Sequence, residues 1–171
     1  MQKCYALSMS STITIMPFSA AVGAVVTGVD LREPLPDKEI VALRRALGEY
    51  GVVFFRDQDL TPEQYISFAE QQGDINVNRF FASVPGHPKI AEVLKEPDHK
   101  RNIGGGWHTD HTYDHIPAMA SILYAREVPS RGGDTLFSNM YLAYETLSEG
   151  MKEMLSGMRA VHSSRHTFGR A

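Results

Sequence analysis

Cysteine is nearly absent from this chain: Cys4 is its single thiol among 171 residues. An internal disulfide framework is therefore excluded, and the cytoplasm is the expected location. The chain also lacks the run of about 20 apolar residues that a membrane-spanning helix needs. Its net charge is only −3, so charge predicts neither a nucleic-acid nor a membrane partner. What remains, 43% hydrophobic and 22% charged residues, is typical of a soluble globular domain.

The first half of the chain carries clear helix and strand signals. Asp37 is expected to cap a helix that Gly51 ends, with apolar residues at helical spacing: Ile40, Leu43, Leu47 and Tyr50. A second helix is predicted to begin at Pro62, because Thr61 and Gln64 can form a capping box, and to end at Gly73. Strands are also predicted over Val52–Phe55 and Ile90–Leu94. Further short strands, separated by Gly23 and Gly28, are predicted around Ile13, Ile15, Val22, Val25, Val26 and Val29.

The second half predicts further strands. They are expected at Met119–Ala125, Thr135–Ser138 and Arg159–Ser163, with helices at Tyr141–Leu147 and Met151–Leu155, the latter capped by Ser148. The polar, glycine-containing segment Glu96–Gly106 is expected to be a loop over a site. Short strands with helices mainly at the front predict a β-rich sandwich or barrel with flanking helices. Residues 1–11 are expected to be a loose extension, and residues 12–171 to belong to a single domain.

The strongest chemical motif is a histidine and a carboxylate two residues apart after a glycine run. It reads Gly104-Gly105-Gly106-Trp107-His108-Thr109-Asp110. On an extended segment, residues i and i+2 point to the same side, so His108 and Asp110 can converge on one ion. Two histidines and one carboxylate on one face of the metal are typical of non-haem Fe(II) oxygenases. The motif predicts two of those three ligands.

Two other interpretations of this stretch remain open on spacing alone. His108 can simply hydrogen-bond a neighbouring carboxylate in a turn. His108, His111 and His115 would share one face of a helix and suggest zinc, although Thr109, Thr112, Tyr113 and Pro117 disfavour a helix there. No glutamate stands where a metalloprotease would need its base.

Several sequence blocks together carry a family resemblance. They are Val53-Phe54-Phe55-Arg56-Asp57-Gln58, Thr61-Pro62, Trp107-His108-Thr109-Asp110, Pro117-Ala118, residues 127–135, Ala143-Tyr144-Glu145 and Gly157-Met158-Arg159-Ala160. Their order resembles the family of taurine dioxygenase and 2,4-dichlorophenoxyacetate dioxygenase. The resemblance covers nearly the whole chain after its first dozen residues.

The resemblance implies a fold, cofactors and roles for particular residues. It implies a double-stranded β-helix (a cupin-like jelly roll), here incomplete, and a dioxygenase that uses Fe(II), 2-oxoglutarate and O₂. It also implies a small-molecule substrate, which is hydroxylated or oxidatively cleaved while 2-oxoglutarate becomes succinate and CO₂. His108 and Asp110 match iron ligands, and Thr135 matches the threonine that contacts the 2-oxoglutarate carboxylate. Tyr113 and Phe168 match aromatic residues beside the substrate.

Other positions depart from taurine dioxygenase on the substrate side. Asn78 stands where that enzyme has a histidine that helps to hold the sulfonate, and His111 stands where it has a small apolar residue. Glycines precede Trp107 in place of polar substrate contacts. Taurine itself is therefore not the expected substrate, although Asn78 and His111 remain predicted substrate contacts.

The third iron ligand of the resembling family has no match in this chain. That family has a later histidine, followed by an arginine for 2-oxoglutarate, and the blocks around His162 and His166 match a segment that does not bind iron. The expectation is that the chain is an N-terminal portion that does not turn over alone. The alternative is a catalytically inactive fragment or binding module. Homo-oligomer formation is one of the expectations for this protein.

Overall fold

The structure, a computed structural model, describes residues 13–100 and 102–165. The chain divides into two compact units, each described here by itself. One comprises Met1–Gln72 with Leu136–Ala143, and the other Gly73–Thr135 with Tyr144–Ala171. The expected extension, residues 1–11, lies outside the described residues, and the single domain over residues 12–171 stays a prediction.

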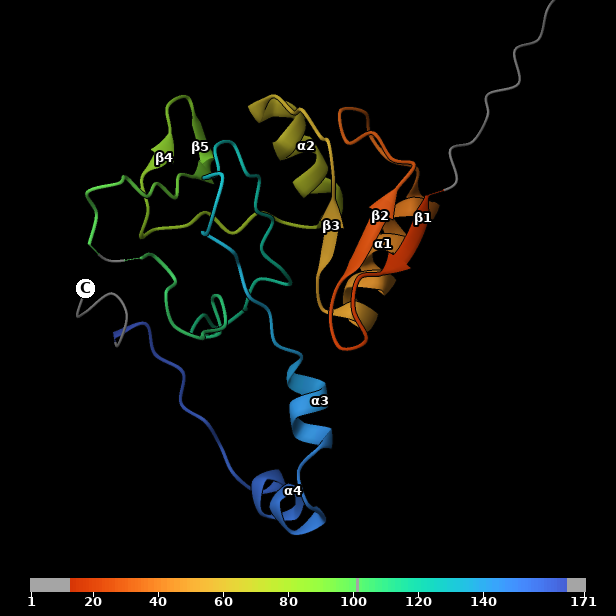
Figure 1. Cartoon of the computed structure of the whole chain (residues 1–171), viewed down its shortest axis with the longest axis vertical. Helices are drawn as coiled ribbons and strands as arrows, with labels where there is room; N and C mark the ends of the chain where they lie inside the picture. The colour runs from red at the N-terminus through yellow and green to blue at the C-terminus, as the bar shows by residue number, and fades with distance from the viewer. Residues whose placement is uncertain (1–12, 101, 166–171) are drawn as a thin grey trace, which may run out of the picture. The chain divides into compact units, whose positions relative to one another are not determined.

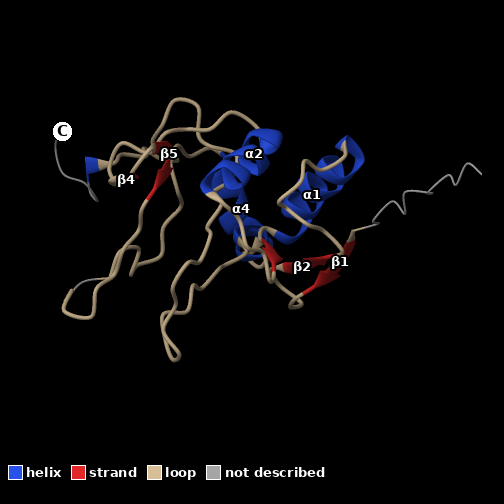
Figure 2. Cartoon of the chain, turned by 90° about the horizontal axis from the view of Figure 1, so that it is seen from above, coloured by secondary structure: helices blue, strands red, loops and turns tan. Residues whose placement is uncertain are grey.

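The first unit is built on a three-stranded sheet in the order β1-β2-β3. β1 (Thr14–Pro17) pairs antiparallel with β2 (Ala24–Thr27), which pairs parallel with β3 (Val53–Phe55). A parallel pair needs a crossover connection, and α1 (Asp37–Tyr50) supplies it between β2 and β3. The three strands lie side by side (Figure 1), and α1 covers one face of the sheet (Figure 2).

Helix α1 confirms the predicted apolar spacing and the stop at Gly51, but not the predicted cap. Gly51 adopts φ 74° and donates its N–H to the carbonyl of Leu47 at 2.8 Å. The prediction that Asp37 caps the helix was wrong. Pro36 is the N-cap residue, and its ring has no acceptor for a side-chain cap. The helical hydrogen bonds begin at the Pro36 carbonyl, which accepts from Glu39 N at 2.8 Å. Asp37 therefore lies in the first turn, where a carboxylate is favourable for the helix dipole.

Helix α2 (Pro62–Gln72) begins with the predicted capping box. Thr61 N donates to Gln64 Oε1 at 2.9 Å, and Gln64 N donates to Thr61 Oγ1 at 3.3 Å. Two otherwise unpaired N–H groups at the helix start are thereby satisfied. The helix buries Phe68, whose ring meets Phe55 of β3 edge-on with centroids 5.7 Å apart.

The hydrophobic core of the described chain lies between β2 and the two helices. Its buried apolar residues are Ala24, Val26, Leu31, Leu35, Ile40, Leu43, Ala46, Leu60 and Phe68. Ala24 and Val26 are two residues apart and therefore share one face of β2. Two glutamine side chains hold the loops around this core: Gln58 Oε1 accepts from Leu31 N, and Gln71 bonds both backbone groups of Leu35.

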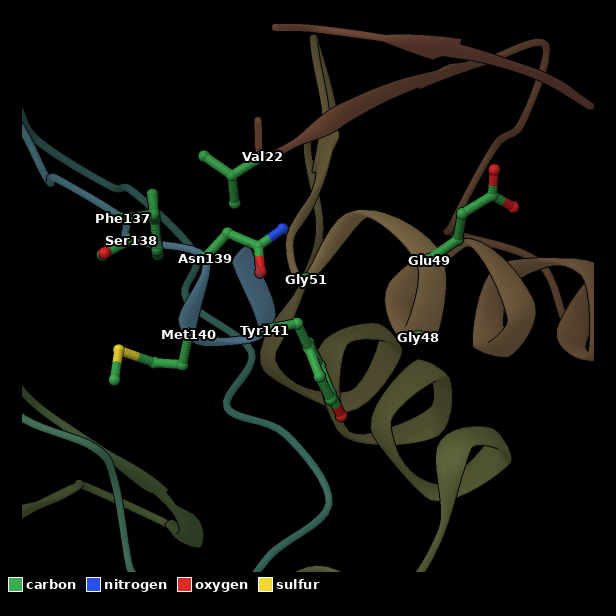
Figure 3. A pocket seen from close by; sticks show the side chains of 9 residues that line it. All are labelled: Val22, Gly48, Glu49, Gly51, Phe137, Ser138, Asn139, Met140 and Tyr141. Atoms are coloured by element: carbon green, nitrogen blue, oxygen red, sulfur yellow. The ribbon is translucent and has the colours of Figure 1, made fainter. Parts of the chain in front are cut away.

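Residues 136–143 return to this first unit. Phe137 meets Phe54 edge-on with centroids 6.0 Å apart, and Asn139 Nδ2 donates to Ala21 O at 2.7 Å. Asn139 Oδ1 also accepts from Leu142 N, at the start of α3 (Met140–Glu145). Figure 3 shows the pocket that residues 137–141 line together with Val22 and with Gly48, Glu49 and Gly51 near the end of α1. None of the predicted site residues within the described ranges lines it.

The second unit has less regular structure. β4 (Ser83–Val84) and β5 (His87–Ala91) form an antiparallel hairpin that turns at Gly86, which has φ 79°. α4 (Glu149–Ser156) has the predicted cap, since Ser148 Oγ accepts from Met151 N at 3.3 Å. In Figure 1, long loops follow the β4–β5 hairpin. Within residues 13–100 and 102–165, the buried apolar residues all belong to the first unit.

The strand predictions of the second half were wrong for this structure. Residues 119–125, 135–138 and 159–163 form no strands, and the strand predicted at Ile90–Leu94 lies instead at His87–Ala91. A β-strand needs a hydrogen-bonded ladder to a neighbouring strand, and neither of the described sheets includes these three stretches. The described part of the chain has helices and two small sheets but no closed barrel.

Candidate metal centre

His108 and Asp110 lie in an exposed loop of the second unit, and their side chains converge. His108 Nδ1 is 2.8 Å from the carbonyl oxygen of Gly106. A carbonyl only accepts hydrogen bonds, so Nδ1 carries the proton and donates it. In the neutral ring, Nε2 then presents a lone pair, and it lies 3.3 Å from Asp110 Oδ1. With the ring neutral, two lone-pair atoms face each other.

This separation fits a shared metal ion. Metal–nitrogen and metal–oxygen bonds of about 2.1 Å that meet at right angles would put the two ligand atoms about 3.0 Å apart. The side chains of His108 and Asp110 are 55% and 51% exposed, so an ion can reach them from solvent. A proton on Nε2 would also allow a hydrogen bond from His108 to Asp110 Oδ1, as the turn interpretation requires. The Nδ1–H bond to a backbone carbonyl is, however, the outer contact that metal-bound histidines usually make.

Ser121 fixes the second oxygen of the Asp110 carboxylate. Its Oγ donates to Asp110 Oδ2 at 2.7 Å, which leaves Oδ1 directed at His108. Such outer contacts hold a ligating carboxylate in the orientation that the metal needs. No sequence pattern pointed to Ser121, because it stands eleven residues after Asp110 in a stretch that predicted only a strand.

Removal of the Ser121 hydroxyl is expected to weaken metal binding without removing it. In Ser121→Ala, the Asp110 carboxylate gains rotational freedom that binding must freeze, so the Co(II) dissociation constant should rise roughly tenfold, the lower end for outer-contact variants. Isothermal titration with Co(II) measures it. Ser130→Ala, in the exposed turn at residues 129–133, is the matched control and should leave binding unchanged. An unchanged constant for Ser121→Ala would show that Asp110 is held in another way.

Gly104 explains part of the glycine run before the motif. It adopts φ 67°, a left-handed conformation that favours glycine, and a Cβ added there would lie 3.2 Å from His108 Cε1. A side chain at this position would therefore press on the imidazole that carries the candidate ligand atom.

A second polar cluster in the same unit joins Asn78, His111 and Asp114. His111 Nδ1 lies 3.0 Å from Asp114 Oδ2, and His111 Nε2 lies 3.5 Å from Asn78 Nδ2. Asp114 also accepts from Arg79 at 2.9 Å and from Asn76 at 3.3 Å. The His111 and Asp114 side chains are only 16% and 15% exposed, so this cluster is more enclosed than the candidate metal pair.

Aromatic rings adjoin the cluster, and its charged groups affect the pKa of the Tyr113 phenol. Tyr113 lies 5.6 Å from the His111 ring and 6.0 Å from the Phe80 ring. Burial raises the pKa of the Tyr113 phenol, and the nearby charges of Asp114 and Asp110 raise it further. The hydrogen bond from His111, helped by Arg79, lowers the pKa of Asp114, which keeps that carboxylate ionised.

Among the predicted substrate contacts, the structure thus brings Asn78, His111 and Tyr113 together. Thr135, the predicted 2-oxoglutarate contact, lies in an exposed segment, and Phe168 and His166 lie outside the described residues. Sequence reasoning missed Asp114, Arg79 and Asn76. Only the i,i+3 spacing of His111 and Asp114 could have signalled part of this network.

Further histidines do not complete a metal site in the described structure. His162 Nδ1 lies 2.8 Å from Thr112 Oγ1, which lies 3.2 Å from Thr109 Oγ1. Residues 108–115 form turns and bends and no helix, so the zinc arrangement of His108, His111 and His115 does not form. Within residues 13–100 and 102–165, no three His, Cys, Asp or Glu side chains are grouped to hold a metal.

No described helix is long and apolar enough to cross a membrane.

Comparison with known proteins assigns the family. The model of the family described as taurine catabolism dioxygenase TauD, TfdA matches residues 14–171, so the chain belongs to this family. Enzymes of this family depend on Fe(II), 2-oxoglutarate and O₂. The resemblance of the sequence blocks is thereby confirmed.

Individual relatives share about a third of their residues with the chain. It is 36% identical over 162 residues to an (S)-phenoxypropionate/alpha-ketoglutarate-dioxygenase from Sphingobium herbicidovorans, covering 93% of the chain and 56% of that enzyme. It is 31% identical to the alpha-ketoglutarate-dependent 2,4-dichlorophenoxyacetate dioxygenase from Cupriavidus pinatubonensis, covering 92% of the chain and 62% of that enzyme.

Solved structures agree with the family. The crystal structure of a taurine dioxygenase from Burkholderia xenovorans superposes with a TM-score of 0.74 at 41% identity, covering 88% of the chain and 53% of that structure. The chain thus spans roughly half the length of the relatives that it matches.

Proposed function

We propose that this chain supplies two protein ligands, His108 and Asp110, to the iron centre of an Fe(II)- and 2-oxoglutarate-dependent dioxygenase that hydroxylates or oxidatively cleaves a small organic substrate. One observation carries the proposal: the Nδ1–H bond to Gly106 O directs the Nε2 lone pair of His108 to within 3.3 Å of Asp110 Oδ1. Cytoplasmic action fits the single cysteine of the chain.

The residues of the chain have separate tasks in this proposal. His108 and Asp110 hold the ion, and Ser121 orients the Asp110 carboxylate through its 2.7 Å hydrogen bond. The Thr135 hydroxyl donates a hydrogen bond to a carboxylate of 2-oxoglutarate. Asn78, His111 and Tyr113 contact the substrate, together with Phe168. Bound iron with 2-oxoglutarate and O₂ supplies the oxidising chemistry, and 2-oxoglutarate leaves as succinate and CO₂.

We further propose that a third histidine and an arginine for 2-oxoglutarate come from polypeptide outside this chain. The many exposed apolar side chains of the second unit support this: Ile116, Leu123 and Val161 are 85%, 73% and 94% exposed. Large exposed apolar patches usually mark surfaces that other polypeptide covers. With that cover, the chain would form part of a jelly roll.

An anaerobic titration tests the function. Fe(II) and 2-oxoglutarate are added to this chain together with the polypeptide that supplies the outside ligands, and the visible charge-transfer absorption of the chelated ion is expected. O₂ should then release succinate. The rival proposal, a binding module without a working iron centre, rests on the pair of donors found here where three are needed. Iron bound without the absorption band or succinate would favour the rival. Steady succinate release by the 171-residue chain alone would contradict the need for outside ligands.

A further inference from the structure

We propose that Asp114 and Asn78 hold His111 as a fixed hydrogen-bond acceptor, so that its Nε2 selects substrates that carry an O–H or N–H group over substrates that present an anion there. This inference deepens the proposed function and rests on it, because the ligand is a substrate only if the chain belongs to a working dioxygenase. It concerns a cluster that is separate from the His108–Asp110 pair, so it can be tested without metal.

The orientation of the Asn78 amide is set by backbone groups. Its Oδ1 accepts from Phe80 N at 2.8 Å and from Phe81 N at 3.2 Å. Since both partners are donors, the oxygen must occupy this position, and the NH₂ group must point the other way. That NH₂ faces His111 Nε2. A donor facing Nε2 requires a lone pair on that nitrogen.

Asp114 requires the complementary arrangement at the other nitrogen. Its Oδ2 lies 3.0 Å from His111 Nδ1, and a carboxylate only accepts, so Nδ1 carries the proton. Arg79 and Asn76 donate to the same carboxylate and keep it in place. Both neighbours of the imidazole therefore select one tautomer, with the proton on Nδ1 and the lone pair on Nε2.

The backbone also holds His111 in position. Its φ is 53°, a left-handed conformation that few residues other than glycine adopt. Asp114 N closes the turn by donating to His111 O at 3.0 Å. Such strain persists only where the surroundings over-determine the conformation, and it gathers at binding and catalytic sites. His111 is thus held through both its backbone and its ring.

The Nε2 lone pair is incompletely used without a ligand. The Asn78 Nδ2 contact, at 3.5 Å, is at the limit of hydrogen-bond length, and the side chain is 16% exposed. A hydroxyl or N–H at ordinary distance would satisfy Nε2 better. An anion would face a lone pair, with the Asp114 carboxylate behind the ring. The neighbouring rings of Tyr113 and Phe80 favour an aromatic or flat apolar body for the same ligand.

The tautomer is tested first on the unaltered, metal-free chain. Two-bond ¹H–¹⁵N correlation spectra distinguish a protonated from an unprotonated ring nitrogen, and we expect His111 to show the proton on Nδ1. Because this measurement needs no variant, a folding defect cannot obscure it. A proton on Nε2 would overturn the proposal. The measurement does not involve iron. The tautomer of His111 can therefore still be determined if the iron titration contradicts the proposed function.

Ligand preference is tested with three small aromatic probes: benzyl alcohol, benzyl methyl ether and benzoate. Benzyl alcohol is expected to bind about tenfold more tightly than the ether, the ratio for one added hydrogen bond, and to move the Nε2 resonance. Benzoate is expected to bind most weakly. Equal binding of alcohol and ether, tighter binding of benzoate, or no binding of the alcohol would each overturn the selection.

Asp114→Ala tests the positioning role. Without the Asp114 carboxylate as acceptor, the proton should distribute over both ring nitrogens of His111. The preference for benzyl alcohol over benzyl methyl ether should then fall to about twofold or less. Asp98→Ala, an exposed carboxylate of the same unit, is the matched control and should retain both the tautomer and the preference. If Asp114→Ala keeps the native spectrum and preference, Asp114 has no positioning role and that part of the proposal fails.

Discussion

Asp110→Ala is expected to lower Fe(II) affinity by more than about a hundredfold, a larger effect than outer-contact substitutions cause. The substitution removes the Oδ1 donor that faces His108 Nε2 at 3.3 Å, and it leaves Ser121 without its acceptor. The remaining imidazole is a single donor and cannot chelate. Anaerobic titration with Fe(II), or with Co(II) as a spectroscopic substitute, measures the loss.

Two further variants separate charge from shape in this experiment. Asp110→Asn can still accept from Ser121 but has lost its charge, so its affinity should lie between those of the native protein and Asp110→Ala. Asp74→Ala removes an exposed carboxylate of the same unit and should change nothing. Native affinity in both Asp110 variants would mean that the carboxylate is no ligand, and the turn interpretation of His108 and Asp110 would then be preferred.

Phe68→Ala should cost about 3–5 kcal/mol of unfolding free energy, the usual range for a buried phenylalanine. Phe68 is 6% exposed between α2 and the sheet, and its ring meets Phe55 edge-on at 5.7 Å. Truncation leaves a cavity and removes that aromatic contact, which adds to the lost burial. The loss is large against the usual total stability of about 5–15 kcal/mol.

Urea unfolding followed by far-ultraviolet circular dichroism measures this cost. Val41→Ala, on the exposed side of α1 where Val41 is 65% exposed, should stay within about 0.5 kcal/mol of the native protein. A cost below about 1 kcal/mol for Phe68→Ala would mean that the core closes around the gap or that α2 is only loosely attached.

Helices were predictable from the sequence where residues close together in the chain determine the helix ends. The box at Thr61 and Gln64, the stop at Gly51 and the cap at Ser148 each act within four residues, and all three occur in the structure. Asp37 was the exception, because the preceding Pro36 already provides the first acceptor carbonyl. Such signals need no distant partner, so a sequence reader can weigh them.

Strands and outer contacts were harder to predict for the same physical reason. The apolar pattern at residues 119–125 describes a face that could be buried, but pairing depends on a neighbouring strand from elsewhere. His108 and Asp110 could be proposed from their spacing. Ser121 and Arg79 reach their partners across 11 and 35 residues, and residue types alone do not encode those contacts.

The partner of His108 Nδ1 is a main-chain oxygen, and this has a consequence for how the sequence can drift. A side-chain substitution at Gly106 leaves that carbonyl in the chain, so the tautomer of His108 depends on loop conformation more than on residue identity. Asp110, in contrast, is oriented by the Ser121 hydroxyl, which a single codon change can remove. Substitutions can therefore adjust the carboxylate side of the metal pair, while the imidazole side is largely protected from them.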